Sequence, residues 1–171
     1  GGVLSMASYP TFDPSEYYTN YSELASDPLS PLFNRATLGT YAPGSTFKMV
    51  TAVGALEEGI ITPTDEIEDT GRYTYYRFYQ PMCWIYRQYG RTHGNVNVTE
   101  ALEVSCNVFF YDVGRRLTIE TLNEYALKFG LGKSTGIELP ERTGILAGPA
   151  SSEERGTTWE EGSVLSAAIG Q

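Results

Sequence analysis

Residues 41–48 read Tyr-Ala-Pro-Gly-Ser-Thr-Phe-Lys, and they place a hydroxyl group and an amine at the start of an apolar segment. Pro43 and Gly44 predict a turn that ends whatever precedes them. From Ser45 onward, apolar residues recur at helical spacing in two stripes, which predicts a helix that ends near Gly59 and is buried on most of its circumference. The stripes consist of Met49, Val53 and Leu56 and of Phe47, Val50 and Gly54.

Ser45 and Lys48 are three residues apart, so they lie on one face of the expected helix. A serine hydroxyl is a poor nucleophile at neutral pH unless a base lies within hydrogen-bond reach. Lysine serves as that base when burial lowers its pKa, and a mostly apolar helix provides such burial. Ser45 also stands at the helix N-terminus, where backbone N–H groups favour negative charge. A bare Ser-x-x-Lys arises by chance, but the longer string at residues 43–48 is far more restrictive.

The composition is that of a folded, acidic protein. The chain has 171 residues, of which 41% are hydrophobic and 19% are charged, and its formal net charge is −9. This length suits one domain with a sizeable core, and the negative charge argues against a nucleic-acid partner, which requires a basic surface. Arginines alternate with aromatic residues over residues 72–91. In an acidic chain we interpret this segment as an aromatic-lined loop over a pocket.

The two ends of the sequence resemble cut ends. The chain opens at Gly1-Gly2 without an initiating Met and closes in the apolar segment 163–171. It contains no apolar run of the roughly 18 residues that a membrane-spanning helix needs, and no signal peptide. We therefore expect residues 1–171 to be part of a single domain within a longer protein.

The cysteines and the histidine do not form a recognisable ligand pattern. Cys83 and Cys106 are too few for a disulfide scaffold and lack metal-ligand spacing, so two free buried thiols and one disulfide both remain open. His93 is the one histidine, and we interpret it as a polar loop residue rather than a member of a catalytic triad or a zinc site. No metal and no cofactor are expected.

Several segments favour strands, turns or loops. Residues 1–9 predict a strand, residues 10–27 an exposed and turn-rich stretch, and residues 26–36 an irregular lead-in. Residues 72–86 are aromatic and β-prone, which predicts a hairpin or an extended loop. Residues 137–139 predict a short strand, and residues 157–162 a loop that contains Trp159.

The segment from residue 97 to residue 130 favours helices. Asn97 and Glu100 have the spacing of a capping box at a helix N-terminus. Residues 105–107, Ser-Cys-Asn, prefer caps and turns, so we expect a break between two helices there that directs Ser105 and Asn107 into a cleft. A further helix is predicted from Thr118, as its N-cap, to a stop at Gly130.

The strings at residues 43–48 and 105–107 resemble, in type and order, the first two of three active-site motifs of penicillin-binding proteins. Further stretches are similar to class B, monofunctional members of this family. They are residues 2–10 with 13–14, residues 34–36, residues 129–132 with 135–137, and residues 168–171. The resemblance covers most of the chain and implies an α+β fold of the β-lactamase and transpeptidase type, with a helical lobe and part of an antiparallel sheet, incomplete in this chain.

The third motif of the family, Lys-[Ser/Thr]-Gly, is expected downstream of residues 168–171, beyond the last residue of this sequence. Residues 133–136, Lys-Ser-Thr-Gly, contain one residue too many, and we interpret them as a structural loop.

The resemblance implies acyl transfer. Ser45 attacks the carbonyl between the two terminal D-alanines of a peptidoglycan stem peptide, and neutral Lys48 takes its proton. Ser105 passes a proton to the departing D-alanine, while Asn107 holds Lys48 and the substrate amide. Ser45 and Asn107 are thus also the substrate-binding residues, and the backbone N–H of Ser45 forms half of an oxyanion hole.

The same resemblance implies the ligands and the location of the protein. The expected partners are stem peptides, β-lactams that are trapped as acyl adducts, and cell-wall synthesis proteins, with no nucleic acid and no cofactor. The expected location is the extracytoplasmic face of the bacterial cytoplasmic membrane, where an N-terminal helix of the longer protein anchors the domain.

Two alternative interpretations are kept. A class D β-lactamase or a related β-lactam sensor shares Ser-Thr-Phe-Lys, but carries Val in place of Asn107 and lacks the Asn34-Arg35-Ala36 lead-in. A truncated or inactive penicillin-binding scaffold is the non-enzymatic alternative, because an incomplete oxyanion hole removes roughly 2–4 kcal/mol of transition-state stabilisation. A Lys-Thr-Gly downstream in the reading frame distinguishes the enzyme from the scaffold.

Overall fold

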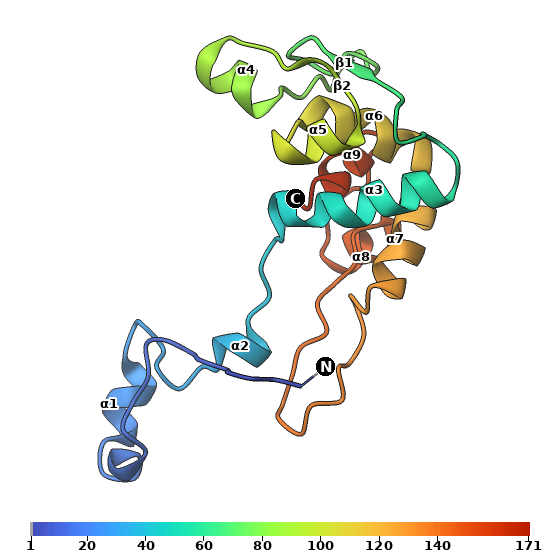
Figure 1. Cartoon of the computed structure of the whole chain (residues 1–171). Helices are drawn as coiled ribbons and strands as arrows, with labels where there is room; N and C mark the ends of the chain where they lie inside the picture. The colour runs from blue at the N-terminus through green and yellow to red at the C-terminus, as the bar shows by residue number, and fades with distance from the viewer. Residues whose placement is uncertain (1) are drawn as a thin grey trace. The chain divides into compact units, whose positions relative to one another are not determined.

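The computed structural model describes residues 2–171, and the chain divides into two compact units. The first unit comprises the described residues up to Tyr41 together with Ser134–Gly144. The second comprises Ala42–Lys133 together with Ile145–Gln171 (Figure 1). The second unit contains both strings that carry the resemblance, so its packing determines the geometry of the site.

The described residues of the first unit form three short helices: the 3-10 helix η1 (Pro14–Glu16), α1 (Tyr21–Ser26) and α2 (Arg35–Leu38). The Asn34 side chain caps α2 by accepting the N–H of Ala36 at 3.0 Å. The predicted strand at residues 1–9 is wrong for residues 2–9, which form no strand, and Gly1 lies outside the described residues. The predicted strand at 137–139 is also wrong. In both segments the described residues offer no neighbouring strand to pair with, and a strand needs such a ladder.

Residues 133–136 form a loop, as expected. The carboxylate of Glu141 accepts hydrogen bonds from the backbone N–H of Thr135, at 3.0 and 3.1 Å, and of Gly136, at 3.2 Å. It also accepts the hydroxyls of Ser134 and Thr135. These hydroxyls therefore serve to hold a turn closed.

The second unit is built on helices that pack around α6 (Asn107–Leu117). Its other helices are the 3-10 helix η2 (Gly44–Phe47), α3 (Lys48–Glu57), α4 (Trp84–Tyr89), α5 (Val98–Glu103), α7 (Ile119–Lys128), α8 (Pro149–Glu154) and α9 (Ser163–Ala168). α6 contacts α9, α3, α7 and α5, and α3 also contacts α7 (Figure 1). Phe109, Phe110 and Leu165 are fully buried at the centre of this core.

Small residues allow these helices to approach closely. A Cβ added to Gly114 in α6 would lie 2.2 Å from the Cβ of Ala168 in α9. A Cβ added to Gly54 in α3 would lie 3.0 Å from the Leu117 side chain. Both distances are shorter than ordinary contact, so these crossings depend on glycine.

The predicted helix after Ser45 is confirmed, with two corrections. Its first turn is the 3-10 helix η2, and the α-helix begins at Lys48. Six of the ten residues of α3 are buried, as predicted, but the stripe that contains Met49 and Val53 is not, because Met49 is 58% and Val53 is 38% exposed. The neighbouring helices cover the opposite side, which presents Val50, Thr51, Ala52, Gly54 and Ala55.

A two-stranded antiparallel sheet precedes α5. β1 (Ile67–Asp69) pairs with β2 (Gly94–Val96), with Ile67 opposite Val96 and Asp69 opposite Gly94. Together with the helices, this sheet agrees with the predicted α+β class. The loop between the strands is closed by a bridge between Arg72 and Met82, as an extended loop or hairpin would be.

The prediction of a hairpin or an extended loop is wrong at the end of this segment, because residues 84–89 form the helix α4. Gly90 ends this helix in the left-handed conformation, with φ of 65°. The indole N–H of Trp84 donates to the carbonyl oxygen of Val104 at 3.0 Å, so a tertiary contact holds this segment against α5. Local β-propensity is overridden there.

The helical predictions for residues 97–130 are confirmed. Asn97 and Glu100 form a capping box at the start of α5, and the chain breaks between α5 and α6. α7 follows Thr118 and stops before Gly130, although the Thr118 side chain makes no capping hydrogen bond. Residues 157–162 form the predicted loop. Among the described helices, none is both long enough and apolar enough to cross a bilayer.

Candidate active site

The break between α5 and α6 directs two polar side chains toward the start of α3. Ser105 lies in the break with a left-handed backbone, φ of 54°, and Cys106 and Asn107 follow as N-cap and first residue of α6. The N–H of Cys106 donates to the carbonyl oxygen of Ala101 at 2.8 Å, which ties the break to α5. A left-handed conformation costs a non-glycine residue about 1–2 kcal/mol, so packing around the break must compensate for this strain.

Lys48 is the centre of the site. Its side chain is buried, and its Nζ donates to the carbonyl oxygen of Ser105 at 2.9 Å, to Ser105 Oγ at 2.9 Å and to Asn107 Oδ1 at 2.6 Å. Ser105 Oγ in turn donates to Ser45 Oγ at 2.8 Å. The structure thus brings together all four residues that the sequence singled out. The Ser105 hydroxyl stands between the Ser45 hydroxyl and the Lys48 amine.

Burial changes the acidity of this lysine. Desolvation lowers the pKa of Lys48 to about 8 from the ordinary value of 10.5, although the nearby thiols of Cys106 and Cys83 act in the opposite direction. The Phe110 ring centroid lies 5.5 Å from Nζ and forms part of the apolar surroundings. At pH 7 a pKa of about 8 leaves roughly a tenth of the amines neutral, compared with about one in three thousand for an exposed lysine.

Ser45 differs from Lys48 in exposure. It lies in η2 and is exposed, whereas Lys48, one turn later, is buried. Thr46 Oγ1 donates to the carbonyl oxygen of Pro43 at 2.8 Å and closes the turn before the helix. The accessible hydroxyl of Ser45 is therefore connected, through Ser105, to the buried amine of Lys48.

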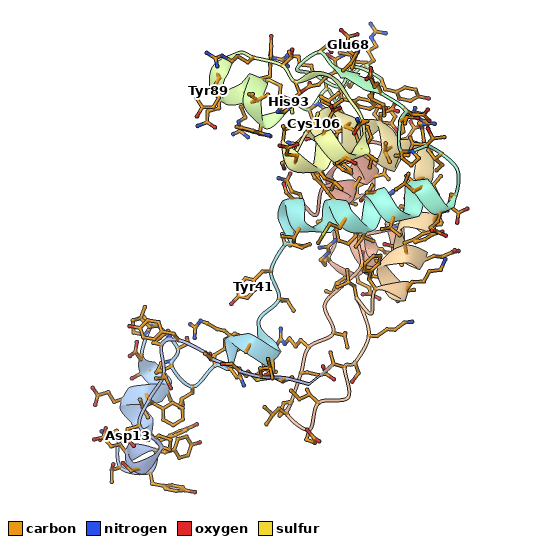
Figure 2. The ribbon with its side chains drawn as sticks, viewed as in Figure 1. Asp13, Tyr41, Glu68, Tyr89, His93 and Cys106 are labelled. Carbon is orange, nitrogen blue, oxygen red and sulfur yellow. The ribbon has the colours of Figure 1, made fainter. Side chains whose placement is uncertain are left out.

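A second polar cluster lies on the other side of the Ser105–Asn107 break, and sequence reasoning missed it. Asp69 ends β1, Cys83 precedes α4, His93 precedes β2 and Cys106 caps α6, and their ligand atoms lie within 4.8 Å of one another. His93 Nδ1 is 2.7 Å from Asp69 Oδ2 and 3.6 Å from Cys83 Sγ. Cys106 Sγ is 3.5 Å from the same carboxylate oxygen. Figure 2 labels His93 and Cys106.

The cluster corrects the interpretation of His93. The residue lies in a loop, as predicted, but its side chain is only 7% exposed and pairs with Asp69. Both cysteines are free buried thiols, which settles the alternative that the sequence left open. The pairing of Asp69 with Gly94 across β1 and β2 places His93 beside Asp69. The proximity of His93 and Asp69 therefore cannot be inferred from their spacing along the chain.

The four side chains fit a metal ion of the zinc type. They offer two thiol sulfurs, one imidazole nitrogen and one carboxylate oxygen, which is a donor set that zinc accepts in tetrahedral sites. Burial raises the pKa of Asp69, but hydrogen bonds from the Gly71 N–H, Cys83 and His93 outweigh it and hold the pKa below its ordinary value. Hydrogen bonds from the Cys106 thiol and from the first N–H groups of α6 lower the pKa of Cys83. Because deprotonated ligands favour metal binding, the lowered pKa values of Asp69 and Cys83 favour it, whereas the hydrogen bond with Cys83 and burial raise the pKa of Cys106 and oppose it.

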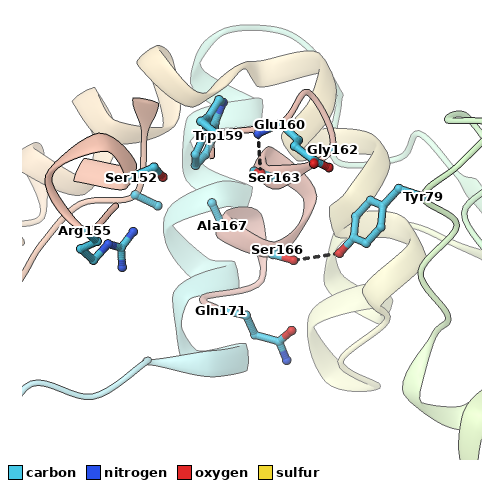
Figure 3. Close-up of a pocket in the computed structure, with 11 residues that line it drawn as sticks. Tyr79, Ser152, Arg155, Trp159, Glu160, Gly162, Ser163, Ser166, Ala167 and Gln171 are labelled. Carbon is cyan, nitrogen blue, oxygen red and sulfur yellow. Dashed lines mark hydrogen bonds between the residues drawn. The ribbon is translucent and has the colours of Figure 1, made fainter. Parts of the chain in front are cut away.

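A cavity of about 310 Å³ is lined by residues of α8, of the loop at residues 157–162 and of α9 (Figure 3). Tyr79, from the predicted aromatic loop, lines it and is hydrogen-bonded through its hydroxyl to Ser166 Oγ at 3.0 Å. Trp159, Arg155 and Gln171 are also in its wall. None of the four candidate catalytic residues lines this cavity, so it is separate from the Lys48 network.

Comparison with known proteins bears on the fold and the family of the chain. The chain matches the family model described as the penicillin binding protein transpeptidase domain over residues 1–170. It is 38% identical to the peptidoglycan D,D-transpeptidase MrdA of Escherichia coli K12 over 184 residues. That match covers 100% of this chain and 28% of the relative, so the chain spans less than a third of the relative's length.

Two solved structures have the same fold. One is the complex between penicillin-binding protein PBP2 and MreC from Helicobacter pylori, with a TM-score of 0.85 and 30% identity over 96% of this chain and 32% of that one. The other is the penicillin G acyl-enzyme complex of penicillin-binding protein A from Mycobacterium tuberculosis. Its TM-score is 0.76, with 28% identity over 98% of this chain and 38% of that one. The α+β fold is thus a partial transpeptidase fold.

Proposed function

Because this chain belongs to the family of penicillin-binding protein transpeptidase domains, we propose that the protein which carries it is a peptidoglycan D,D-transpeptidase with a serine acyl-enzyme mechanism. One observation carries the proposal for the residues: the continuous hydrogen-bond chain from Ser45 through Ser105 to Lys48, with Asn107 Oδ1 as a further acceptor of the amine. We also propose that residues 1–171 form part of one transpeptidase domain.

The first step is acylation. With Lys48 neutral, the Ser45 hydroxyl attacks the carbonyl carbon between the two terminal D-alanines of a stem peptide. Its proton moves to Ser105 Oγ as the Ser105 proton moves to Lys48 Nζ, because Ser105 Oγ lies within 2.9 Å of both groups. The new C–O bond leaves negative charge on the carbonyl oxygen, and the backbone N–H of Ser45 is one donor that can stabilise it.

The second step expels the terminal D-alanine. The Lys48 ammonium returns a proton through Ser105 to the departing nitrogen, the C–N bond breaks, and an ester remains on Ser45. Asn107 holds the amine of Lys48 through Oδ1 at 2.6 Å, which leaves its NH₂ group free to bind a substrate carbonyl. An amine from a second stem peptide then attacks the ester and releases Ser45.

Relatives support the choice of ligands and location. Penicillin-binding protein A of M. tuberculosis forms an acyl-enzyme complex with penicillin G, and PBP2 of H. pylori forms a complex with MreC. By likeness to them, we expect this protein to be acylated by β-lactams, to act on stem peptides and to assemble with cell-wall synthesis proteins. We place it at the extracytoplasmic face of the cytoplasmic membrane.

Intact-mass spectrometry tests the proposal. The full-length protein, incubated with benzylpenicillin, is expected to gain the mass of one penicillin, and the Ser45→Ala variant is expected to gain none. An adduct that persists in Ser45→Ala would show that another residue is the nucleophile. A folded wild-type protein that gains no mass would favour the inactive scaffold, and rapid loss of the adduct by hydrolysis would favour a β-lactamase.

A further inference from the structure

The C-terminal end of α9 (Ser163–Ala168) and the residues that follow it are hydrogen-bonded to the segment that carries Ser45 and Lys48. The carbonyl oxygen of Gly170 accepts the N–H of Gly44 at 2.9 Å, and the carbonyl oxygen of Ala168 accepts Thr51 Oγ1 at 2.8 Å. The first bond is made by Gly44, which immediately precedes Ser45. The second is made by Thr51, which follows Lys48 by three residues. The two bonds therefore bracket the nucleophile and the base.

The bond from Thr51 restrains the rotation of α3. Thr51 and Ala168 are both fully buried, so water cannot replace the hydrogen bond between them. Thr51 follows Lys48 by three residues and thus lies on the same face of the helix. Rotation or sliding of α3 that would move Lys48 relative to Ser105 also breaks the bond from Thr51.

Gly170 restrains the turn before Ser45. Its backbone is left-handed, with φ of 76°. A Cβ at this position would lie 2.3 Å from the carbonyl oxygen of Gly44 and 2.9 Å from the Cβ of Phe47. The close contact with the turn at residues 44–47 therefore requires glycine on both grounds.

α9 is itself fixed against the helix that carries Asn107. Ala168 packs on Gly114 of α6 so closely that a Cβ on Gly114 would lie 2.2 Å from it. α6 holds Asn107 at its N-terminus, and the Gly44–Lys48 segment holds Ser45. α9 thus connects both halves of the site, which supplements the direct packing of α3 on α6.

We infer that Thr51 and Gly170 are positioning residues for acylation, through which the end of α9 sets the place of Ser45 and Lys48 relative to Ser105 and Asn107. The inference rests on the proposed function. Neither residue contacts the reacting atoms. Their effect is expected in the rate of the chemical step, since displacement of reacting groups by about 1 Å can reduce a rate by up to roughly 100-fold.

The test uses Thr51→Val in the full-length protein, because valine keeps the shape of threonine and removes the hydroxyl. Acylation by a fluorescent penicillin is resolved into the dissociation constant of the first complex and the acylation rate constant. We expect the rate constant to fall about tenfold and the dissociation constant to stay within about twofold. Thr51→Ser, which keeps the hydroxyl, is expected to restore the rate.

Thr37→Val is the matched control. Thr37 is buried in the first unit, and its hydroxyl has no hydrogen-bond partner among the described residues, so the same substitution removes no bond there. Its acylation rate is expected to equal that of the wild type. Gly170→Ala is the second variant, and we expect slower acylation together with faster hydrogen exchange at the Gly44 N–H.

The outcomes separate this inference from the proposed function. If the wild type forms no Ser45-dependent adduct, the proposed function fails and this inference fails with it. If the wild type is acylated and folded Thr51→Val reacts at the same rate, the inference alone is wrong. Should Thr51→Val not fold, an unchanged acylation rate in Gly170→Ala overturns it. Equal loss of rate in Thr51→Ser and Thr51→Val overturns it as well, because the hydroxyl would then be irrelevant.

Discussion

At the scale of single residues, the surroundings of Lys48 fit its proposed role as a base. Its amine is buried and has three acceptors at 2.6–2.9 Å, which satisfy all three N–H groups of the ammonium form. When the amine is neutral, its lone pair can accept the proton of the Ser105 hydroxyl. The same contacts thus serve both protonation states, and desolvation shifts the balance toward the neutral one.

The pH dependence of acylation follows from this pKa. Since the proposed mechanism requires neutral Lys48, the acylation rate constant is expected to rise about tenfold per pH unit below pH 7 and to level off above about 8. Stopped-flow measurement with a fluorescent penicillin at pH 5.5–9.5 provides the profile. Lys48→Arg keeps the charge but cannot lose its proton, so its rate is expected to be at least about 100-fold lower at every pH. A flat profile in the wild type contradicts the role of Lys48 as base.

Stability depends on the same group with a defined sign. The pKa of Lys48 is lower in the folded protein, about 8, than the ordinary value of 10.5, so the unfolded chain binds more protons between these limits. The contribution of Lys48 to the free energy of unfolding therefore rises with pH across that window. At pH values below that window, Lys48 is protonated in both the folded and the unfolded state. Burial of its ammonium group then lowers the free energy of unfolding by its full amount.

Ser105 lies between the nucleophile and the base, so its hydroxyl is expected to carry the proton. Ser105→Ala should lower the acylation rate constant by about 100-fold or more, while the affinity of the first complex changes little. Ser134→Ala is the matched control, since Ser134 belongs to the loop closed by Glu141 and is expected to leave acylation unchanged. If Ser105→Ala reacts at the wild-type rate, Lys48 must reach Ser45 without it.

At the scale of elements, the break between α5 and α6 serves two clusters at once. Ser105 and Asn107 face Lys48, while Cys106 between them faces Asp69, Cys83 and His93. The N–H of Asn107 also donates to Cys83 Sγ at 3.3 Å. The loop that carries two candidate catalytic residues is therefore held by side chains from the sheet and from the segment before α4.

The donor set of this cluster predicts that the full-length protein binds one zinc ion, measured by elemental analysis after purification without chelator. Removal of the metal with a chelator is expected to lower the melting temperature. Asp69→Asn should bind zinc more weakly, whereas Asp65→Asn should not. The two aspartates are matched because each accepts a backbone N–H. Asp69 accepts that of Gly71, and Asp65 accepts that of Thr62. A protein without zinc and with an unchanged melting temperature after chelation contradicts this prediction.

At the scale of the molecule, the second unit is a core of short helices in which α6 and α9 approach each other closely at Gly114 and Ala168. This contact holds together two elements that carry or contact the site. α6 carries Asn107, and Gly170, which follows α9, contacts the turn before Ser45. The chain covers 28% of MrdA of E. coli, and its place in one transpeptidase domain stays a prediction.

Gly114→Ala tests the core at this scale. The added methyl would lie 2.2 Å from the Cβ of Ala168, so α6 and α9 must separate. We expect a loss of about 1–3 kcal/mol in the free energy of unfolding, measured by denaturant titration. Gly148→Ala is the control, because its methyl would meet no atom closer than Asn123 Nδ2 at 3.7 Å. Equal stability of the two variants would show that the crossing is looser than the structure indicates.

The sequence by itself determined the features that depend on near neighbours. The turn at Pro43-Gly44, the helix after Ser45, the capping box at Asn97 and the break at residues 105–107 follow from dihedral preferences, caps and helical spacing within a few residues. The family resemblance is confirmed by comparison. The catalytic roles of Ser45, Lys48, Ser105 and Asn107 stay predictions, although the four side chains do lie together.

Only the tertiary structure decided the features that depend on distant residues. The exposure of Met49, the helix at residues 84–89 and the absence of strands from described residues 2–9 and 137–139 are set by what packs or pairs nearby. Asp69 and His93 meet because β1 pairs with β2. Thr51 of α3 donates to the carbonyl oxygen of Ala168 in α9, and Gly170 accepts the N–H of Gly44 in the turn before Ser45. Such contacts join residues far apart in the chain, where local preference holds no information about which surfaces meet.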